Sequence, residues 1–177
     1  MKILDSILAE YPFFQGLVPE HLHILSECAV NTSFGAGAYL FLENEPATDF
    51  YVIRRGKVVL ETSDPHLGIV AIETIDGGDV LGWSWLFSPY RWHFSARAVE
   101  SCGVIMLDGA LLREKCEQNH DFGYELVKRC ASIIMERLQA TRKQLIDAYN
   151  IGMIRDSQMD QQKGVELKRV PPPYYTL

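Results

Sequence analysis

The chain has 177 residues, of which 47% are hydrophobic, and a formal net charge of -6. This composition excludes a disordered chain and a small disulfide scaffold, because there is enough apolar material for one buried core. The negative charge argues against a broad nucleic-acid-binding face, which needs clustered Lys and Arg. Four widely spaced cysteines form no CxxC pair, so we expect reduced thiols and no metal site: Cys28, Cys102, Cys116 and Cys130.

The sequence shows neither a membrane-spanning pattern nor a secretion-signal pattern. No apolar run reaches about 18 residues, and the N-terminus lacks the basic, apolar and small-residue order of a signal peptide. We therefore expect a soluble cytoplasmic protein that makes no membrane contact.

In chain order, two short helices come first, over residues 3–9 and 19–29, where apolar residues recur at helical spacing and Pro19 suits a first turn. Short β-rich runs punctuated by turn residues follow, at 38–42, 49–54, 57–63, 67–75, 92–99 and 102–107. Many short strands at regular intervals predict a mainly β domain, either a sandwich or a barrel.

Two further helices are expected over 111–117 and 121–149. The longer one has an apolar seam at steps of three and four, typical of a coiled coil, formed by Val127, Ala131, Ile134, Leu138, Thr141 and Leu145. A second stripe contains Leu126, Cys130 and Ile133. We predict that the seam joins two copies in a parallel homodimer. The alternative is that both stripes pack within one chain.

The last segment differs in composition from the rest. Residues 151–177 are mixed in charge and end in VPPPYYTL, which predicts a flexible proline-containing tail after a domain of residues 1–150. Pro171–Tyr174 also matches a pattern that proline-recognising domains bind, although such short patterns often arise by chance.

The segment from Gly82 to Ala98 contains all three tryptophans, two arginines and a histidine. Aromatic faces can stack on a planar ring, and a guanidinium can bind phosphate with two hydrogen bonds. The segment therefore predicts a pocket for an anionic, ring-bearing ligand. The alternative is that Trp83, Trp85 and Trp92 fill a core.

Several motifs together resemble the cyclic nucleotide-binding domain family, in particular the catabolite-activator type of regulator. They are PFFQGL at 12–17, DFYVIRRGKV at 49–58, GGDVLG at 77–82 and SARA at 95–98. The resemblance covers residues 12 to about 149. It implies an eight-stranded jelly-roll barrel (a double-stranded β-helix), a short helix in a phosphate-binding cassette, and a long C-terminal helix that dimerises and caps the pocket. It also implies cyclic AMP or cyclic GMP as the small-molecule effector.

The cassette departs from the family pattern at two positions. In the family, a glutamate after the glycine holds a ribose hydroxyl, and an arginine six residues before the alanine of the closing strand pairs with the phosphate. Trp83 and Trp92 occupy these places, and an indole can replace neither a carboxylate nor a cation. Arg91 is one residue away, and strand alternation points it to the opposite face from Trp92.

Two versions of the binding hypothesis follow. In one, a cyclic mononucleotide binds with Arg91 as the phosphate partner, and Gly82 and Ser84 offer backbone amides. In the other, the pocket takes a different ligand or is filled by its own side chains. The candidate ligand-binding residues are Gly82, Trp83, Ser84, Trp85, Leu86, Arg91, Trp92, His93 and Ser95.

The sequence gives little support for an enzyme or for a DNA-binding protein. His21 and His23 with Glu27 have cupin-like spacing, but on a helix the two histidines lie on nearly opposite faces, so we expect surface or capping histidines and no metal site. No nucleophile elbow, Walker loop or HExxH motif is present, so we expect a protein that is not an enzyme. Only 27 residues follow position 150, fewer than a winged helix-turn-helix needs. We expect no direct nucleic-acid contact, and signalling through the dimer helix or an unknown protein partner. A dimeric interaction scaffold that binds no ligand, or none that is a nucleotide, remains the alternative.

Overall fold

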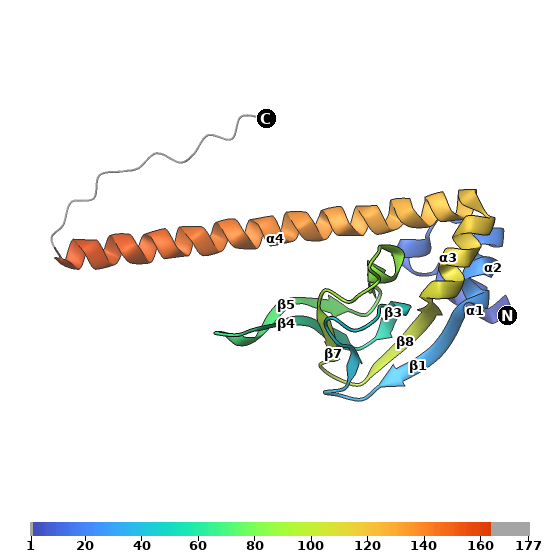
Figure 1. The fold of residues 1–177 in the computed structure, drawn as a ribbon, viewed down its shortest axis with the longest axis horizontal. Coiled ribbons are helices and arrows are strands. Elements are labelled where there is room, and N and C mark those ends of the chain that lie inside the picture. The colour runs from blue at the N-terminus through green and yellow to red at the C-terminus, as the bar shows by residue number, and fades with distance from the viewer. Residues whose placement is uncertain (1, 164–177) are drawn as a thin grey trace. The chain divides into compact units, whose positions relative to one another are not determined.

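Two antiparallel sheets make up the body of the computed structural model, which describes residues 2–163 (Figure 1). One sheet has the strand order β1 (Ala29–Phe34), β8 (Cys102–Asp108), β3 (Asp49–Arg55) and β6 (Val80–Leu81). The other has the order β2 (Tyr39–Phe41), β7 (Ser95–Ala98), β4 (Lys57–Asp64) and β5 (Gly68–Asp76). The mainly β, jelly-roll class expected from the sequence is confirmed, with eight strands in the described residues.

The main core lies between these sheets, because both of them contribute inward-facing residues. Strand alternation selects the contributors: Ala96 and Ala98 of β7 face Val58 and Leu60 of β4. The cluster contains Leu40, Phe41, Ala47, Tyr51, Ile53, Val58, Leu60, Ile75, Leu81, Trp92, Ala96, Ala98, Cys102 and Val104.

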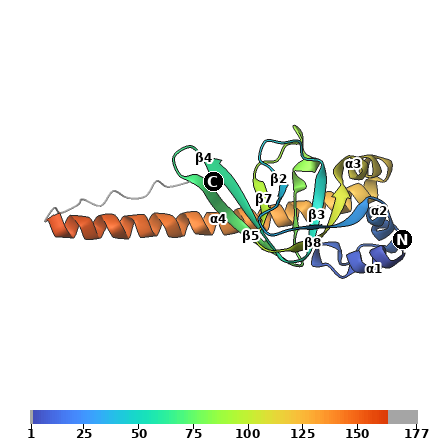
Figure 2. The same ribbon diagram turned by 90° about the horizontal axis from the view of Figure 1, so that it is seen from below.

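A projecting hairpin is formed by β4 and β5, whose far ends extend beyond the neighbouring strands (Figures 1 and 2). Its turn is fixed by Asp64, whose Oδ1 accepts hydrogen bonds from the backbone N–H groups of His66 and Leu67, both at 2.8 Å. These bonds lower the pKa of Asp64, since they favour the carboxylate. The turn holds Leu67 at the tip, where its side chain is 77% exposed.

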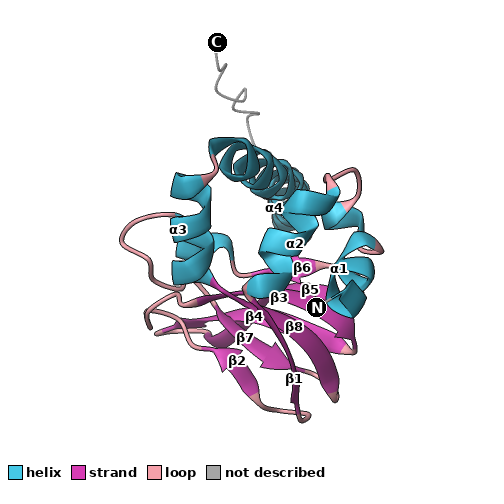
Figure 3. Ribbon diagram, turned by 90° about the vertical axis from the view of Figure 1, so that its right-hand side faces the viewer, coloured by secondary structure: helices cyan, strands magenta, loops and turns pink. Residues whose placement is uncertain are grey.

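Three α-helices gather at one end of the sheets: α1 (Lys2–Ala9), α2 (Pro19–Glu27) and α3 (Gly109–Gln118) (Figure 3). The 3-10 helix η1 (Pro12–Phe14) links α1 to α2. Asp108 caps α3 by accepting a hydrogen bond from the N–H of Leu111 at 2.9 Å. Strand β3 is buried on both faces, because Tyr51 lies in the core between the sheets while Phe50 contacts Phe13 of η1.

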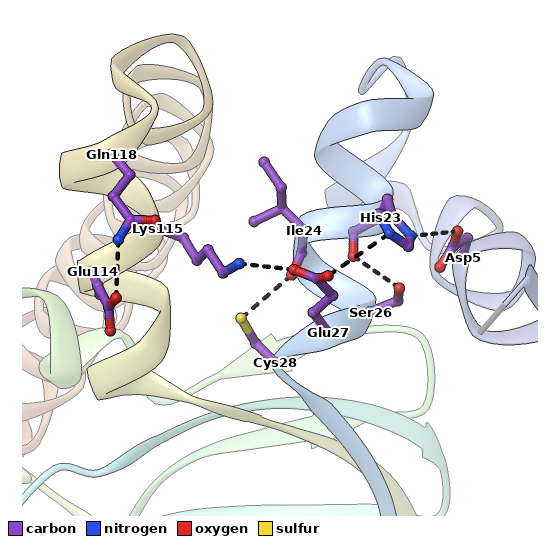
Figure 4. A network of polar contacts seen from close by, with 9 residues as sticks. All are labelled: Asp5, His23, Ile24, Ser26, Glu27, Cys28, Glu114, Lys115 and Gln118. Carbon is purple, nitrogen blue, oxygen red and sulfur yellow. Dashed lines mark hydrogen bonds and ion pairs between the residues drawn. The ribbon is translucent and has the colours of Figure 1, made fainter.

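A chain of polar contacts joins these three helices (Figure 4). His23 lies between two carboxylates, with Nδ1 3.4 Å from Oδ2 of Asp5 in α1 and Nε2 3.8 Å from Oε1 of Glu27. Lys115 of α3 donates to Oε2 of Glu27 at 2.8 Å. This bond and the positive charge of Lys115 lower the pKa of Glu27. The predicted role of His23 as a surface residue agrees with its exposed side chain.

The last helix, α4 (His120–Lys163), is longer than the helix expected over 121–149. Residues 151–163 are helical, so the flexible tail predicted to begin at 151 is wrong for that stretch, because the helical pattern continues past Asn150. Residues 164–177, including Pro171–Tyr174, lie outside the described residues. Contacts divide the chain into two compact units, Met1–Cys130 and Ala131–Leu177. A domain of residues 1–150 stays a prediction.

Smaller differences concern the ends of elements. The helix predicted over 19–29 ends at Glu27, and Ala29 already belongs to β1, a strand that the pattern did not separate. Two-residue β6 is too short to show alternation. The strand predicted over 92–99 is confined to β7, because residues 90–92 pair instead with the loop at 44–47. Among residues 2–163, no helix has the combined length and apolar character needed to cross a bilayer.

Candidate functional site

The connection between β6 and β7, residues 82–94, is called the cassette below. It begins at Gly82, whose φ of 91° lies in the left-handed region, and continues as the 3-10 helix η2 (Trp83–Leu86), where a short helix was expected. A Cβ at position 82 would lie 3.2 Å from the ring of Trp92. Glycine is therefore required here both for the backbone angle and for the close approach of an indole.

Trp85 of η2 is completely buried, at 0% exposure. Its ring contacts Phe50 of β3, with 6.2 Å between the ring centroids. The first residue of α3, Gly109, comes so close that a Cβ there would lie 2.7 Å from the Cβ of Trp85. The Nε1–H of Trp85 has no acceptor in the described part of the chain. Trp85 therefore anchors the cassette to β3 and α3 as a buried residue.

Trp92 lies inside the main core with 3% of its surface exposed. Its indole stacks on Phe41, with centroids 3.8 Å apart and planes inclined by 15°, and Tyr51 contacts it from 6.3 Å. This is the position that the family resemblance gives to the phosphate-binding arginine. An apolar ring therefore fills the place where the family pattern requires a cation.

The side chain of Arg91 is exposed, on the other side of the backbone from Trp92. Backbone bonds fix this alternation, since the N–H of Trp92 donates to Glu45 and its carbonyl accepts from Asn44. The guanidinium Nη1 of Arg91 donates to the carbonyl of Asn44 at 2.6 Å. Arg91 thus does not face the space that Trp92 occupies, and the register shift needed to bring it there is not observed.

An ion pair between the buried Glu61 and the partly exposed Arg97 lies on the outer face of the second sheet. Glu61 is 3% exposed and accepts hydrogen bonds from Nε and Nη2 of Arg97, the shortest at 2.8 Å. Tyr39 adds a bond to Oε1 at 2.7 Å. Arg97 is the main cause of a lowered pKa at Glu61, and Tyr39 contributes as well. Because Glu61 already occupies it, Arg97 does not offer an unpaired guanidinium to an anion in this structure.

A continuous set of contacts joins the cassette to the first turns of α4. Phe50 contacts Trp85 on one side and Phe13 of η1 on the other, with a centroid distance of 5.3 Å to Phe13. The carbonyl of Phe13 accepts a hydrogen bond from Nη1 of Arg129 at 2.7 Å. His21 of α2 packs edge-on against Phe122, at 5.5 Å. The beginning of α4 is therefore held by the same aromatic cluster that holds Trp85.

The structure brings only some of the predicted ligand-binding residues together. Gly82 meets Trp92, and the Oγ of Ser84 lies 3.2 Å from Nδ1 of His93. Ser95 points to the outer face, where its Oγ accepts a hydrogen bond from the backbone N–H of Glu43 at 2.9 Å. Trp83 and Leu86 are partly exposed. Sequence reasoning missed Phe41, Tyr51, Glu61 and Arg113, and only Glu61, a charge within an apolar strand, gave a signal.

Metal chemistry has little support in the described residues. The residues whose side chains the structure describes, 4–150, contain no group of three or more His, Cys, Asp or Glu placed to hold a metal ion. His23 is exposed as expected, but His21 is buried against Phe122, so the prediction of a surface or capping histidine is wrong for His21. All four cysteines are free thiols, and burial raises the pKa of Cys28 and Cys116 to about 11 and of Cys130 to about 12.

Comparisons with known proteins agree with this architecture. The family model for the cyclic nucleotide-binding domain matches residues 31–119. A CRP-like cAMP-activated global transcriptional regulator of Mycobacterium tuberculosis is 28% identical over 145 residues, which are 81% of this chain and 62% of the regulator. The chain thus spans about three fifths of the length of that curated relative.

Solved structures give the same result. A candidate cyclic nucleotide-binding protein from Geobacter metallireducens is 30% identical, with a TM-score of 0.69 over 76% of this chain and 97% of that one. A cyclic nucleotide-binding domain from Methylobacillus flagellatus has a TM-score of 0.71 at 16% identity, over 83% of both chains, and so supports the fold alone. Because the family model covers half of the chain, including seven of the eight strands in full and the cassette, the chain belongs to the cyclic nucleotide-binding domain family.

Proposed function

We propose that this chain is a non-catalytic, cytoplasmic regulatory module whose cassette is filled by its own side chains, and that its output passes through α4 to a second copy or a protein partner. The observation that carries the proposal is the position of Trp92, stacked on Phe41 in the core at 3% exposure. The four free cysteines suit a reducing compartment.

The contacts of the cassette favour this version over binding of cyclic AMP or cyclic GMP. A cyclic phosphate carries a charge that must be paired when it leaves water. Within the cassette the nearest cation in sequence, Arg91, is exposed and bonded to a carbonyl, and beyond it Arg97 is paired with Glu61. Binding of a nucleotide in the family's manner would require Trp92 to leave the core, with loss of its stacking on Phe41.

The seam on α4 supports the proposed output. Val127, Leu138 and Leu145 are 42%, 60% and 66% exposed. Exposed leucines repeating at seven-residue spacing along one helix are typical of a coiled-coil interface. We propose that the predicted seam, Val127, Ala131, Ile134, Leu138, Thr141 and Leu145, pairs in parallel with that of a second copy.

Isothermal titration calorimetry with cyclic AMP and cyclic GMP tests the filled cassette. We expect no saturable heat at ligand concentrations up to about 1 mM, which corresponds to a binding free energy weaker than about -4 kcal/mol. Saturable binding in the micromolar range by the unaltered protein would overturn the proposal and restore the sensing role.

A gain-of-function variant provides the positive control. Trp83→Glu combined with Trp92→Arg restores the two residue types of the family pattern, and circular dichroism shows whether the variant folds. We expect this double variant to bind cyclic nucleotide at least about a hundredfold more tightly than the unaltered chain, because a paired charge and a ribose acceptor then exist. A folded double variant that binds nothing would show that the indole rings are not the obstacle.

The oligomeric state is tested separately by size-exclusion chromatography with light scattering. Leu138→Asp places a charge in the seam and is expected to convert the dimer into a monomer, because a buried unpaired carboxylate is costly. Gln139→Asp, on the adjacent exposed position, is the matched control and should leave the mass unchanged. A monomeric unaltered protein would refute the dimer.

A further inference from the structure

The outer end of the cassette carries a cluster of aromatic and cationic side chains that the filled core does not use. Phe87 and Tyr90 are 47% and 41% exposed. The guanidinium of Arg113, from α3, lies over the ring of Tyr90 with its carbon 4.5 Å from the centroid. Arg91 follows Tyr90 directly and is exposed. These four residues are called the cassette-tip surface.

Both arginines of this surface bond to neutral acceptors. Arg91 donates to the carbonyl of Asn44, and Arg113 donates to the carbonyl of Trp85. Among residues 4–150, whose side chains the structure describes, neither guanidinium has a carboxylate within ion-pair distance, whereas Arg97 and Lys115 each do. A carbonyl supplies a hydrogen bond but no net negative charge. Two guanidinium groups, one on the cassette and one over the ring of Tyr90, therefore have no acidic partner on a chain whose net charge is -6.

The backbone holds the surface in place. Tyr90 donates its N–H to the carbonyl of Phe87 at 2.8 Å and accepts a hydrogen bond from the N–H of Ala47 at 2.7 Å. Arg91 forms an antiparallel bridge with Pro46. Because these bonds fix the loop beforehand, a partner would not have to order it, which reduces the entropic cost of binding.

We propose that the cassette-tip surface docks an acidic segment of another protein that also carries an apolar side chain. Carboxylates of the segment would pair with Arg91 and Arg113, and the apolar group would lie on Phe87 and Tyr90. Arg and Tyr are residue types enriched at interfaces, where a guanidinium pairs with carboxylates through two parallel bonds. This inference goes beyond the proposed function and does not depend on whether the core takes a ligand.

A nucleic-acid partner fits the cassette-tip surface less well than an acidic protein segment does. Aromatic rings and arginines also bind single-stranded RNA, but such sites follow the phosphate backbone with a longer run of positive charge. Here the uncompensated charge is limited to two guanidinium groups on an acidic protein.

The test uses the full chain and a short fluorescein-labelled peptide that alternates Asp or Glu with Leu and Phe. A control peptide, the Lys twin, has the same sequence with Lys in place of every Asp and Glu. Fluorescence anisotropy measures affinity, and ¹H–¹⁵N chemical-shift changes locate the contact. We expect the acidic peptide alone to bind, with shifts at Phe87, Tyr90, Arg91 and Arg113, and with affinity falling as salt increases.

Reversing the charge of single exposed arginines distinguishes binding at the cassette-tip surface from a general attraction between the acidic peptide and positive residues. Arg91→Glu should weaken the acidic peptide at least about tenfold. The matched control is Arg54→Glu, because Arg54 is an exposed arginine that also bonds to a neutral acceptor, the Oδ1 of Asn31 at 2.9 Å. It should change affinity by less than about twofold, since distant surface charges are screened.

Phe87→Ser tests the apolar contact in a chain that keeps both arginines, and circular dichroism confirms that each variant folds. Equal binding to Arg91→Glu, binding of the Lys twin, or shifts confined to other elements would each overturn the proposal. So would the absence of binding by the acidic peptide. A single-stranded RNA that binds the same four residues more tightly than the peptide would also overturn it, in favour of nucleic acid.

Discussion

Replacing Trp92 with Ala should destabilise this domain far more than replacing any exposed aromatic residue of the cassette. The indole is 3% exposed and lies in the core between the two sheets. Its removal leaves a cavity next to Phe41 and Tyr51, the two rings that contact it. The surrounding strands are paired on both sides at β7 and β4, so they have little freedom to close the gap.

The magnitude follows from burial and packing. Truncation of a buried aromatic side chain to Ala costs about 3–5 kcal/mol, and loss of a stacked partner accounts for about 0.5–1.5 kcal/mol of such a loss. For a domain of this size each 1 kcal/mol lowers Tm by about 2–4 °C. We therefore expect Trp92→Ala to lower Tm by about 6–20 °C.

Thermal and urea unfolding followed by circular dichroism measures this change. Phe87→Ala is the matched control, since Phe87 belongs to the same connection but is 47% exposed. It should cost less than about 1 kcal/mol. Equal destabilisation by the two substitutions would refute the conclusion that Trp92 fills the core. If Trp92→Ala does not fold, Trp92→Phe gives a smaller loss that must still exceed the control.

Three further predictions concern other contacts. Arg97 and Tyr39 hold the pKa of Glu61 in the folded state below its ordinary value of 4.5. The ionised Glu61 therefore contributes fully to folding stability above pH 4.5, and this contribution is lost as the pH falls through the folded pKa. In urea unfolding at a series of pH values, Glu61→Gln should therefore flatten the loss of stability as the pH falls below 4.5, and an unchanged slope would contradict the pairing. Arg129→Ala removes the bond to the Phe13 carbonyl and should speed amide hydrogen exchange in the 3-10 segment about tenfold, whereas unaltered exchange would show that this bond does not hold η1. Gly82→Ala should cost about 1–3 kcal/mol in the same unfolding assay, because Ala is strained at a φ of 91°, and a neutral effect would argue against the left-handed backbone.

Local patterns were sufficient to predict most of the fold. The β-rich runs of β4 and β5 between turn residues, and the helical spacing around Pro19, reflect short-range geometry, so these elements could be located from sequence. β1 and β6 escaped, since β1 begins directly after a helix and β6 has two residues. The end of α4 also depends on the helix continuing beyond its most apolar part.

The cassette shows the limit of such reasoning. Alternation correctly placed Trp92 and Arg91 on opposite faces, and the two departures from the family pattern could be seen in the sequence. The stacking of Trp92 on Phe41 could not be predicted from the sequence. It joins residues 51 positions apart, through a register that is set by the backbone bonds at 44–47. The positions of Arg97 and Arg113 likewise depend on which strand or helix lies beside them.

The three tryptophans of the chain all fall between positions 83 and 92. Indole emission, excited near 295 nm, therefore originates from this one connection and nowhere else in the protein. A red shift or quenching of that emission would report water reaching the rings, and an unchanged spectrum during partner binding would place the event outside their surroundings. The native chain is thus its own spectroscopic probe of the connection, without an added label.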